Sequence, residues 1–124
     1  MLAEQEVMAT VPVKDIGAAR AFYEGKLGLP VEGTMGDQVV RYRCGGGKLL
    51  VYVSEFAGTN RATAVTWAVA DVDAEVRALA AKGVAFERYD IPGATMQGDV
   101  HVMGPIRNAW CKDPDGNILS IVSA

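Results

Sequence analysis

An internal repeat constrains the fold of this chain more than any other feature of its sequence. Asp15 stands between a strand-like run that ends at Val13 and the helix-like run IGAARAFYEGKLG, and Asp71 stands between AVTWAV and VDAEVRALAAKG in the same way. Asp is a favoured helix N-cap, because its carboxylate accepts hydrogen bonds from the free N–H groups of the first turn. Apolar residues recur at helical spacing in both runs. The pattern predicts helices over about residues 16–27 and 72–82.

The remainder of each half follows the same plan. A strand is expected after each helix, starting at Val31 and at Val84. The segments GDQVVRYRCGGGKLLVYVSE and GPIRNAWCKDPDGNILSIVSA then each give a strand, a turn and a strand, and DPDGN is typical of a hairpin turn. Between these two segments, Gly47 matches Gly116 and Tyr42 matches Trp110.

Each half is therefore a β-α-β-β-β unit, which leaves one sheet face in need of a partner. We expect an α+β fold of two βαβββ modules, over about residues 5–57 and 61–124, with the break near Gly58 to Arg61. At 124 residues, the chain has the usual size of one domain.

Composition and charge narrow the possible partners. The chain carries 12 Lys and Arg against 15 Asp and Glu, so a net charge of −3 gives no basic surface for nucleic acid. The start, MLAEQEV, lacks the features of a signal peptide, and no apolar run approaches the length of a membrane span. We expect a cytoplasmic protein that binds neither nucleic acid nor a membrane. Cys44 and Cys111 are too few for a disulfide framework and are expected to be reduced structural thiols.

Three stretches of the sequence follow a known family pattern: VPVKDIGAARAFYEGKLGLPVEG, AVADVDAEVRALAAKGV and DPDGN. They resemble the vicinal oxygen chelate superfamily, which includes glyoxalases, bleomycin-resistance proteins, fosfomycin-resistance enzymes and extradiol dioxygenases. The resemblance covers nearly the whole chain. It implies a single domain over residues 1–124, in which paired βαβββ modules form a cupped mixed sheet around a cleft. It also implies a homodimer. The superfamily hosts many chemistries, so the resemblance says little about activity.

Metal-dependent members of this superfamily take His, Gln and Glu ligands from the first and last strands of their modules. Carried over by position, the ligand sites fall on Met8, Val51, Ala64 and Ser120. A thioether, two hydrocarbon side chains and a neutral hydroxyl cannot replace the hydration shell of a divalent ion. We therefore expect no metal and no cofactor.

The residues expected in the cleft are apolar, aromatic or weakly polar. Alternation along the strands puts Thr10 beside Met8 and Thr66 beside Ala64, while the resemblance puts Trp110 in the pocket with Tyr42 as its mate. On this basis Arg41 and Arg43 face out. The expected ligand-binding set is Met8, Thr10, Tyr42, Val51, Ala64, Thr66, Asn108, Trp110 and Ser120. The alternative that both aromatic residues fill an ordinary core remains open.

The segment DIPGATMQGDVHVMGP, rich in Gly and Pro, is expected to form a loop that could cover the cleft. His101 on this loop is a candidate for acid or base catalysis, although a lone His in a loop is usually a surface residue. The first functional hypothesis is a metal-free protein that binds a small apolar or aromatic molecule, for sequestration or resistance. The alternative is a metal-independent lyase or isomerase that uses His101. A metal-dependent glyoxalase or dioxygenase is opposed by the residues at all four ligand positions.

Overall fold

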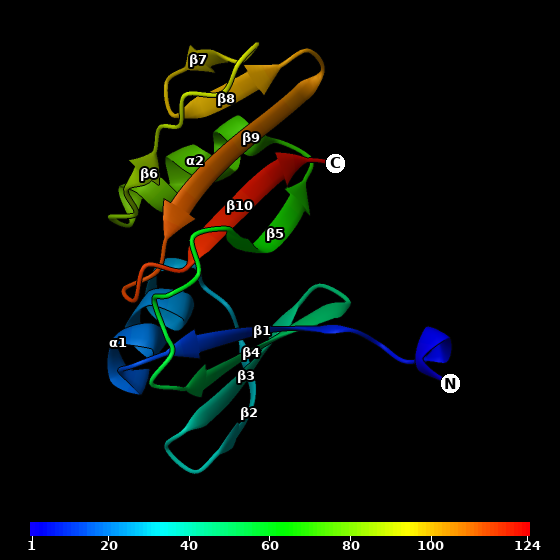
Figure 1. Cartoon of the computed structure of the whole chain (residues 1–124), viewed down its shortest axis with the longest axis vertical. Coiled ribbons are helices and arrows are strands. Elements are labelled where there is room, and N and C mark those ends of the chain that lie inside the picture. The colour runs from blue at the N-terminus through cyan, green and yellow to red at the C-terminus, as the bar shows by residue number, and fades with distance from the viewer. The chain divides into compact units, whose positions relative to one another are not determined.

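The computed structural model describes all 124 residues. The chain falls into two compact units, Met1–Thr59 and Asn60–Ala124, each with its own sheet (Figure 1). Both units combine strands with helices, and the fold is of the α+β class that the repeat predicts. No helix in the chain has the length and apolar character needed to cross a membrane.

The first unit is a four-stranded sheet with one helical segment. The strand order is β1-β4-β3-β2, with β1 parallel to β4 and the other pairs antiparallel. Its elements are η1 (Leu2–Glu4), β1 (Met8–Val13), α1 (Ile16–Arg20), the π-helical η2 (Ala21–Lys26), β2 (Val31–Met35), β3 (Val39–Cys44) and β4 (Gly47–Val53).

The helical segment of the first unit begins as predicted. The Asp15 carboxylate accepts a hydrogen bond of 3.1 Å from the backbone N–H of Ala18, which makes Asp15 the N-cap. After one turn the helix widens into η2, where the N–H of Leu27 bonds to the carbonyl of Phe22. The helix predicted over about 16–27 is therefore confirmed, as α1 followed by η2, and η2 brings Phe22 and Tyr23 into the core.

One face of the first sheet packs against this helical segment. The rings of Tyr23 and Tyr42 stack with centroids 6.0 Å apart, which places Tyr42 on the helix side of β3. Strand pairing puts Leu49, opposite Tyr42, and Val51 on the same side, and both are buried. The opposite face of each sheet is called the helix-free face below.

The second unit has the larger sheet, with strand order β5-β10-β9-β8-β7 and with β6 paired to β9. Its strands β5 and β10 are parallel, and the other pairs are antiparallel. The elements are β5 (Thr63–Val69), α2 (Val72–Ala81), β6 (Phe86–Glu87), β7 (Thr95–Gln97), β8 (Val100–Met103), β9 (Ile106–Lys112) and β10 (Ile118–Ser123).

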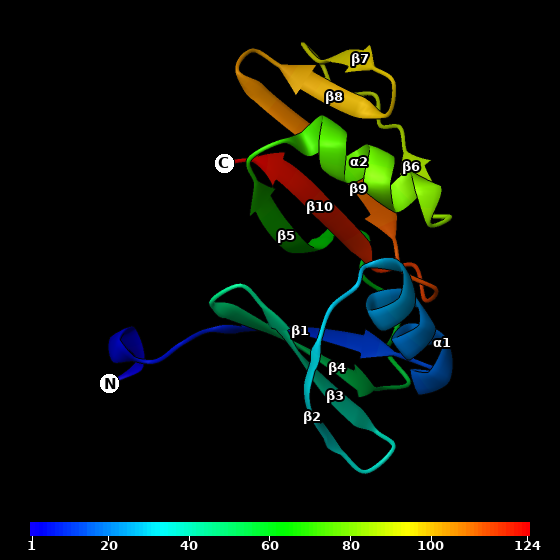
Figure 2. The ribbon, with the colours of Figure 1, turned by 180° about the vertical axis from the view of Figure 1, so that it is seen from behind.

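Helix α2 confirms the second helix prediction and covers one face of this sheet (Figure 2). Its N-cap Asp71 accepts a hydrogen bond of 3.0 Å from the N–H of Ala74. Val72 and Val76 of the helix form a buried cluster with Val100 of β8, Ala109 of β9 and Ile121 of β10. Trp67 is level with Ile121 in the adjacent strand and lies on this helix side, as expected.

Of the two hairpins in the second unit, one was predicted from the sequence and the other was expected to be a loop. The turn between β9 and β10 forms as predicted, because the Asp113 carboxylate accepts hydrogen bonds from the N–H groups of Asp115 and Asn117. The segment over residues 90–105, by contrast, is not simply a loop, since most of it forms the β7–β8 hairpin. Gly98 takes a positive φ of 62° at its turn. A Gly-rich composition suits tight hairpin turns as well as loops, which explains the error.

Candidate functional site

The helix-free face of the second sheet carries the residues from which we build the site. Thr66 of β5 is level with Ser120 of β10, which is level with Trp110 of β9. Asn108 lies two residues from Trp110 on the same face and pairs with His101 of β8. The structure thus brings together four residues of the expected binding set, with His101 beside them.

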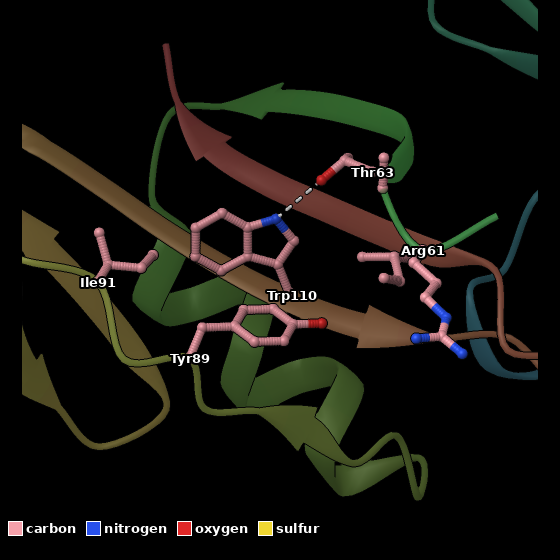
Figure 3. Close-up of a pocket in the computed structure, with 7 residues that line it drawn as sticks. Arg61, Thr63, Tyr89, Ile91 and Trp110 are labelled. Atoms are coloured by element: carbon pink, nitrogen blue, oxygen red, sulfur yellow. Dashed lines mark hydrogen bonds between the residues drawn. The ribbon is translucent and has the colours of Figure 1, made fainter.

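Three aromatic rings meet on this face. The ring of His101 lies edge-to-face with Trp110 at a centroid distance of 4.9 Å, and the ring of Tyr89 lies edge-to-face with it at 5.4 Å. Such pairs are stabilised by the ring quadrupoles in addition to apolar burial. The indole N–H of Trp110 donates a hydrogen bond of 3.2 Å to the Thr63 hydroxyl (Figure 3). These contacts on several sides hold the indole in one orientation.

His101 is fully buried, with 0% of its surface exposed, so the expectation of a loop residue is wrong. The backbone N–H of Tyr89 donates a 2.9 Å hydrogen bond to its Nε2 atom. An Nε2 atom that accepts a hydrogen bond carries no proton, which leaves the proton of the ring on Nδ1. Nδ1 is buried and has no hydrogen-bond partner. The ring therefore has no free lone pair with which to take a proton from a ligand.

Ser120 and Asn108 are engaged with each other. The Ser120 hydroxyl donates a 2.9 Å hydrogen bond to Oδ1 of Asn108, and Ser120 is buried. On the helix side of β9, Cys111 is also buried, and this burial raises the pKa of its thiol to about 11. A thiol that stays protonated at neutral pH is a poor nucleophile, as expected for a structural cysteine.

A pocket of about 300 Å³ opens beside the aromatic rings (Figure 3). Trp110 and Tyr89 form two of its walls, and the remainder is mainly aliphatic. It is lined by Arg61, Ala62, Thr63, Tyr89, Ile91, Trp110 and Ile118. Of these residues, only Trp110 belongs to the expected binding set.

Tyr89 and Arg61 are the main residues that sequence reasoning missed. Tyr89 follows the two-residue strand β6, and Arg61 precedes β5, so neither belongs to a strand pattern from which a facing side could be deduced. Burial raises the pKa of the Tyr89 hydroxyl, with a smaller contribution from the negative charge of Glu87. The one available signal was Tyr89 itself, as an aromatic residue in the polar segment ERYD.

In the first unit the expected binding residues do not share one face. Thr10 is level with Leu50 of β4, and Leu50 is level with Arg41 of β3. These three residues occupy the helix-free face, where Met8 also begins β1. Tyr42 and Val51 lie on the helix side and are both 0% exposed, so their expected position in a cleft on the helix-free face is wrong.

The error came from the turns. The β3–β4 hairpin pairs Cys44 with Gly47 across a two-residue turn, whereas the β9–β10 hairpin pairs Lys112 with Ile118 across five residues. Matching Gly47 with Gly116 therefore shifted β4 by one position, and matching Tyr42 with Trp110 shifted β3 by one position, because Arg41 is level with Leu50 as Trp110 is level with Ser120. Because strand side chains alternate, a one-residue shift exchanges the faces. Leu50, not Val51, is the counterpart of Ser120.

The same correction applies to the neighbouring charges. Arg41 and Arg43 were expected to face away from the site side of the sheet, but they lie on its helix-free face, opposite Leu50 and Lys48. Glu32 lies 3.7 Å from the guanidinium of Arg41 and 3.3 Å from the ammonium of Lys48. This face is therefore charged.

Two positions remain to be placed. Met8 is at the start of β1 and is 39% exposed, level with Lys48. Ala64 falls at an irregularity of β5, where the pairing with β10 passes from Thr63 to Val65 and leaves Ala64 without a level partner. Nowhere does the chain gather three or more His, Cys, Asp or Glu side chains that could hold a metal ion.

Comparisons with known proteins give the fold a context. The model of the Glyoxalase/Bleomycin resistance protein/Dioxygenase superfamily matches residues 7–121. None of the curated proteins matches the chain significantly.

Among solved structures, the bleomycin-binding protein of the bleomycin-producing Streptomyces verticillus, complexed with copper(II)-bleomycin, is 20% identical with a TM-score of 0.75. That match covers 100% of this chain and 99% of the other. A glyoxalase/bleomycin resistance protein from Catenulispora acidiphila is 25% identical with a TM-score of 0.72, covering 98% and 99%. A lactoylglutathione lyase from Agrobacterium tumefaciens is 18% identical with a TM-score of 0.74, covering 98% and 94%.

The solved structures at 18% and 20% identity establish only that the fold is shared. The family model, by contrast, matches nearly the whole sequence. The chain belongs to the Glyoxalase/Bleomycin resistance protein/Dioxygenase superfamily.

Proposed function

We propose that this chain binds a small, planar, weakly polar molecule in the pocket beside Trp110. The observation that carries the proposal is the aromatic cluster on the helix-free face, where Thr63, His101 and Tyr89 hold the indole beside an apolar hollow. Small-molecule sites are typically apolar and aromatic hollows with a few polar groups that fix orientation. A rigid indole offers a flat surface for an aromatic ligand at little cost in conformational entropy.

Binding is better supported than catalysis by a metal-independent lyase or isomerase. Such an enzyme needs a group that accepts and returns a proton within reach of the substrate. Nε2 of His101 already accepts a hydrogen bond from the backbone of Tyr89, and Ser120 is bonded to Asn108. Neither residue is available as a base in this arrangement.

The proposed binding uses no metal. The four family ligand positions carry Met8, Ala64, Ser120 and, with the corrected register, Leu50 in place of Val51. Leu50 is a hydrocarbon like Val51, so the correction adds no donor. A thioether, a hydroxyl and two hydrocarbons do not form a site for a divalent ion.

Sequestration is the biological role that this proposal favours. One structural relative is described as a bleomycin-binding protein from a bleomycin-producing organism. A binding protein of that kind needs affinity without chemistry, which matches a pocket with an apolar wall and engaged polar groups. By analogy, the ligand of this chain would be a drug-like or metabolite-like aromatic molecule held away from its target.

The chain is also proposed to form a homodimer, as the family resemblance implies. Soluble homo-oligomers most often have two-fold symmetry. Light scattering at micromolar concentration should give twice the chain mass of 13.1 kDa. A constant monomer mass across the concentration range would contradict the dimer.

The binding proposal is tested first by a thermal-shift screen of planar aromatic molecules, because a ligand that binds the folded state raises Tm by mass action. A hit that is not itself fluorescent is then titrated against tryptophan emission. The chain has two tryptophans, so Trp67→Phe leaves Trp110 as the only reporter and Trp110→Phe leaves Trp67.

Quenching is expected in Trp67→Phe and not in Trp110→Phe. Trp110→Ala should weaken binding by more than tenfold, equivalent to about 1.4 kcal/mol. Trp67 lies on the helix side, which makes Trp67→Phe the matched control. Quenching that follows Trp67, or unchanged affinity in Trp110→Ala, would make Trp110 a residue of structure only.

A further inference from the structure

We propose that the pocket beside Trp110 selects a planar aromatic molecule that carries an anionic group, such as an aromatic carboxylate. This inference rests on the proposed function, because it names the class of molecule bound at the same site. It is carried by two polar groups of the pocket, the Arg61 guanidinium and the Tyr89 hydroxyl, which have no hydrogen-bond or salt-bridge partner within the chain.

Arg61 is the only charged residue that lines the pocket. It is exposed, and none of the salt bridges or side-chain hydrogen bonds of the chain includes it. The acidic residue Glu87, which is level with Trp110 on the neighbouring strand, lies 3.8 Å from Lys112. Its charge is therefore already partly balanced. An unpaired guanidinium at the mouth of an apolar hollow is suited to bidentate recognition of a carboxylate.

Tyr89 provides the second observation. Its hydroxyl oxygen is buried and has no hydrogen-bond partner. Buried hydroxyls in native proteins are almost always bonded, so an orphaned one in the wall of a pocket indicates a place for a ligand atom. Figure 3 shows this hydroxyl directed toward the guanidinium of Arg61, with both groups at the same pocket.

The Arg61 guanidinium and the Tyr89 hydroxyl both require a hydrogen-bond acceptor on the ligand. A guanidinium has only donors, and the Tyr89 hydroxyl has a proton to donate, because burial raises its pKa. A ligand oxygen that accepts from both, attached to a flat ring against Trp110, would satisfy every unpaired group of the pocket. The net charge of the chain is −3, so general electrostatic attraction does not favour anions. The preference must come from Arg61.

The test compares 2-naphthoate with 2-naphthamide by isothermal titration calorimetry. The two probes share the same ring, and they differ in charge at the group that would meet Arg61. We expect 2-naphthoate to bind the wild-type chain at least tenfold more tightly, and the preference to shrink as salt is raised, because Arg61 is exposed. Arg61→Gln should abolish the preference, because it should weaken 2-naphthoate far more than 2-naphthamide. Tyr89→Phe, which keeps the ring, should weaken 2-naphthoate about threefold to tenfold.

Arg88→Gln is the matched control, because Arg88 is also an exposed arginine of the second unit but does not line the pocket. It should leave both affinities unchanged. Equal binding of the two probes, with both weakened by Trp110→Ala, would overturn the anion preference and leave the aromatic pocket standing. A preference for 2-naphthoate that survives Arg61→Gln would also overturn it. Absence of binding by both probes at millimolar concentration would overturn this inference and, for planar bicyclic ligands, the proposed function.

Discussion

The helix-free faces of the two sheets have the same strand pairing but carry different kinds of side chain, charged in the first unit and aromatic in the second. In the first unit the ladder runs Thr10, Leu50, Arg41, and in the second it runs Thr66, Ser120, Trp110. Each begins with a threonine on a strand that is parallel to the next one. The first ladder ends at Arg41, which lies near the charges of Glu32 and Lys48. The second ends at Trp110, which lies in an aromatic cluster.

This comparison teaches that the repeated framework fixes where side chains point and leaves their chemistry free. The pairing pattern of the strands determines which residues share a face. A change from Trp to Arg at one rung leaves the backbone pairing intact. Function on such a fold must therefore be argued from the residues on each face, unit by unit.

The largest expected effect tests the corrected register in the first unit. Val51→Asp places a carboxylate on the buried helix side and should lower the free energy of unfolding by about 3–5 kcal/mol, because the charge has no partner there. Leu50→Asp is the matched control on the helix-free face, where Leu50 is only partly buried. It should cost about 1 kcal/mol, as most ordinary substitutions do. Urea denaturation measures both, and equal losses would break the assignment of faces.

A second prediction compares the hydrogen bonds of the two aromatic residues that the sequence matched. Tyr42 is buried and its hydroxyl donates a 2.8 Å hydrogen bond to the Glu24 carboxylate. Tyr42→Phe should cost about 1.5–3 kcal/mol, the range for hydrogen bonds to charged groups. Thr63→Val removes the acceptor of the Trp110 indole and should cost about 0.5–1.5 kcal/mol, because that bond is neutral and lies at an exposed residue. A larger loss for Thr63→Val than for Tyr42→Phe in urea titrations would reverse the contrast.

A third prediction concerns how the stability of the first unit depends on pH. The hydrogen bond from Arg20, at 2.7 Å, lowers the pKa of Glu24, and the Tyr42 hydroxyl acts in the same direction. A carboxyl group with a lowered folded-state pKa stabilises the protein above its unfolded-state pKa, and this contribution is lost as the pH falls through the folded-state value.

The free energy of unfolding of the wild type should accordingly exceed that of Glu24→Gln by about 1 kcal/mol near neutral pH. The difference is modest because the ion pair of Glu24 with Arg20 is partly exposed. The difference should close as the pH is lowered, which Tm measurements from about pH 7 to about pH 3 would follow. Glu75→Gln, on the exposed surface of α2, serves as the control. A difference that stays constant over this range would mean that the charge of Glu24 does not contribute.

The smallest expected effect is a null one. With hydrocarbon, thioether and hydroxyl side chains at the family ligand positions of both units, EDTA should leave Tm unchanged. Elemental analysis of the purified protein should find no stoichiometric Zn, Ni, Fe or Mn. One metal ion per chain would show that the two units hold donors in an arrangement that the positional comparison missed.

The sequence by itself determined the elements and their kind. Asp15 and Asp71 mark both helix starts because N-capping is a local interaction, which depends on residues three positions away. The turn DPDGN predicted its hairpin for the same reason. Alternation also put Asn108 on the face of Trp110, since strand periodicity is a property of the chain, whereas the places of Trp110 and Ser120 came from the family resemblance.

Only the tertiary structure decided which side chains of the first sheet face the helical segment, and which residues surround Trp110. Val51 lies on the helix side because a two-residue turn sets the register of β4, and Tyr42 lies there because its ring stacks on Tyr23. The sequence pattern does not reveal an offset of one residue. Tyr89 and Arg61 reach the pocket from segments outside the main strands, and His101 is buried through its contacts with Tyr89 and Trp110. These contacts join residues far apart in the chain, and long-range packing, unlike capping or alternation, leaves no periodic signal in the sequence.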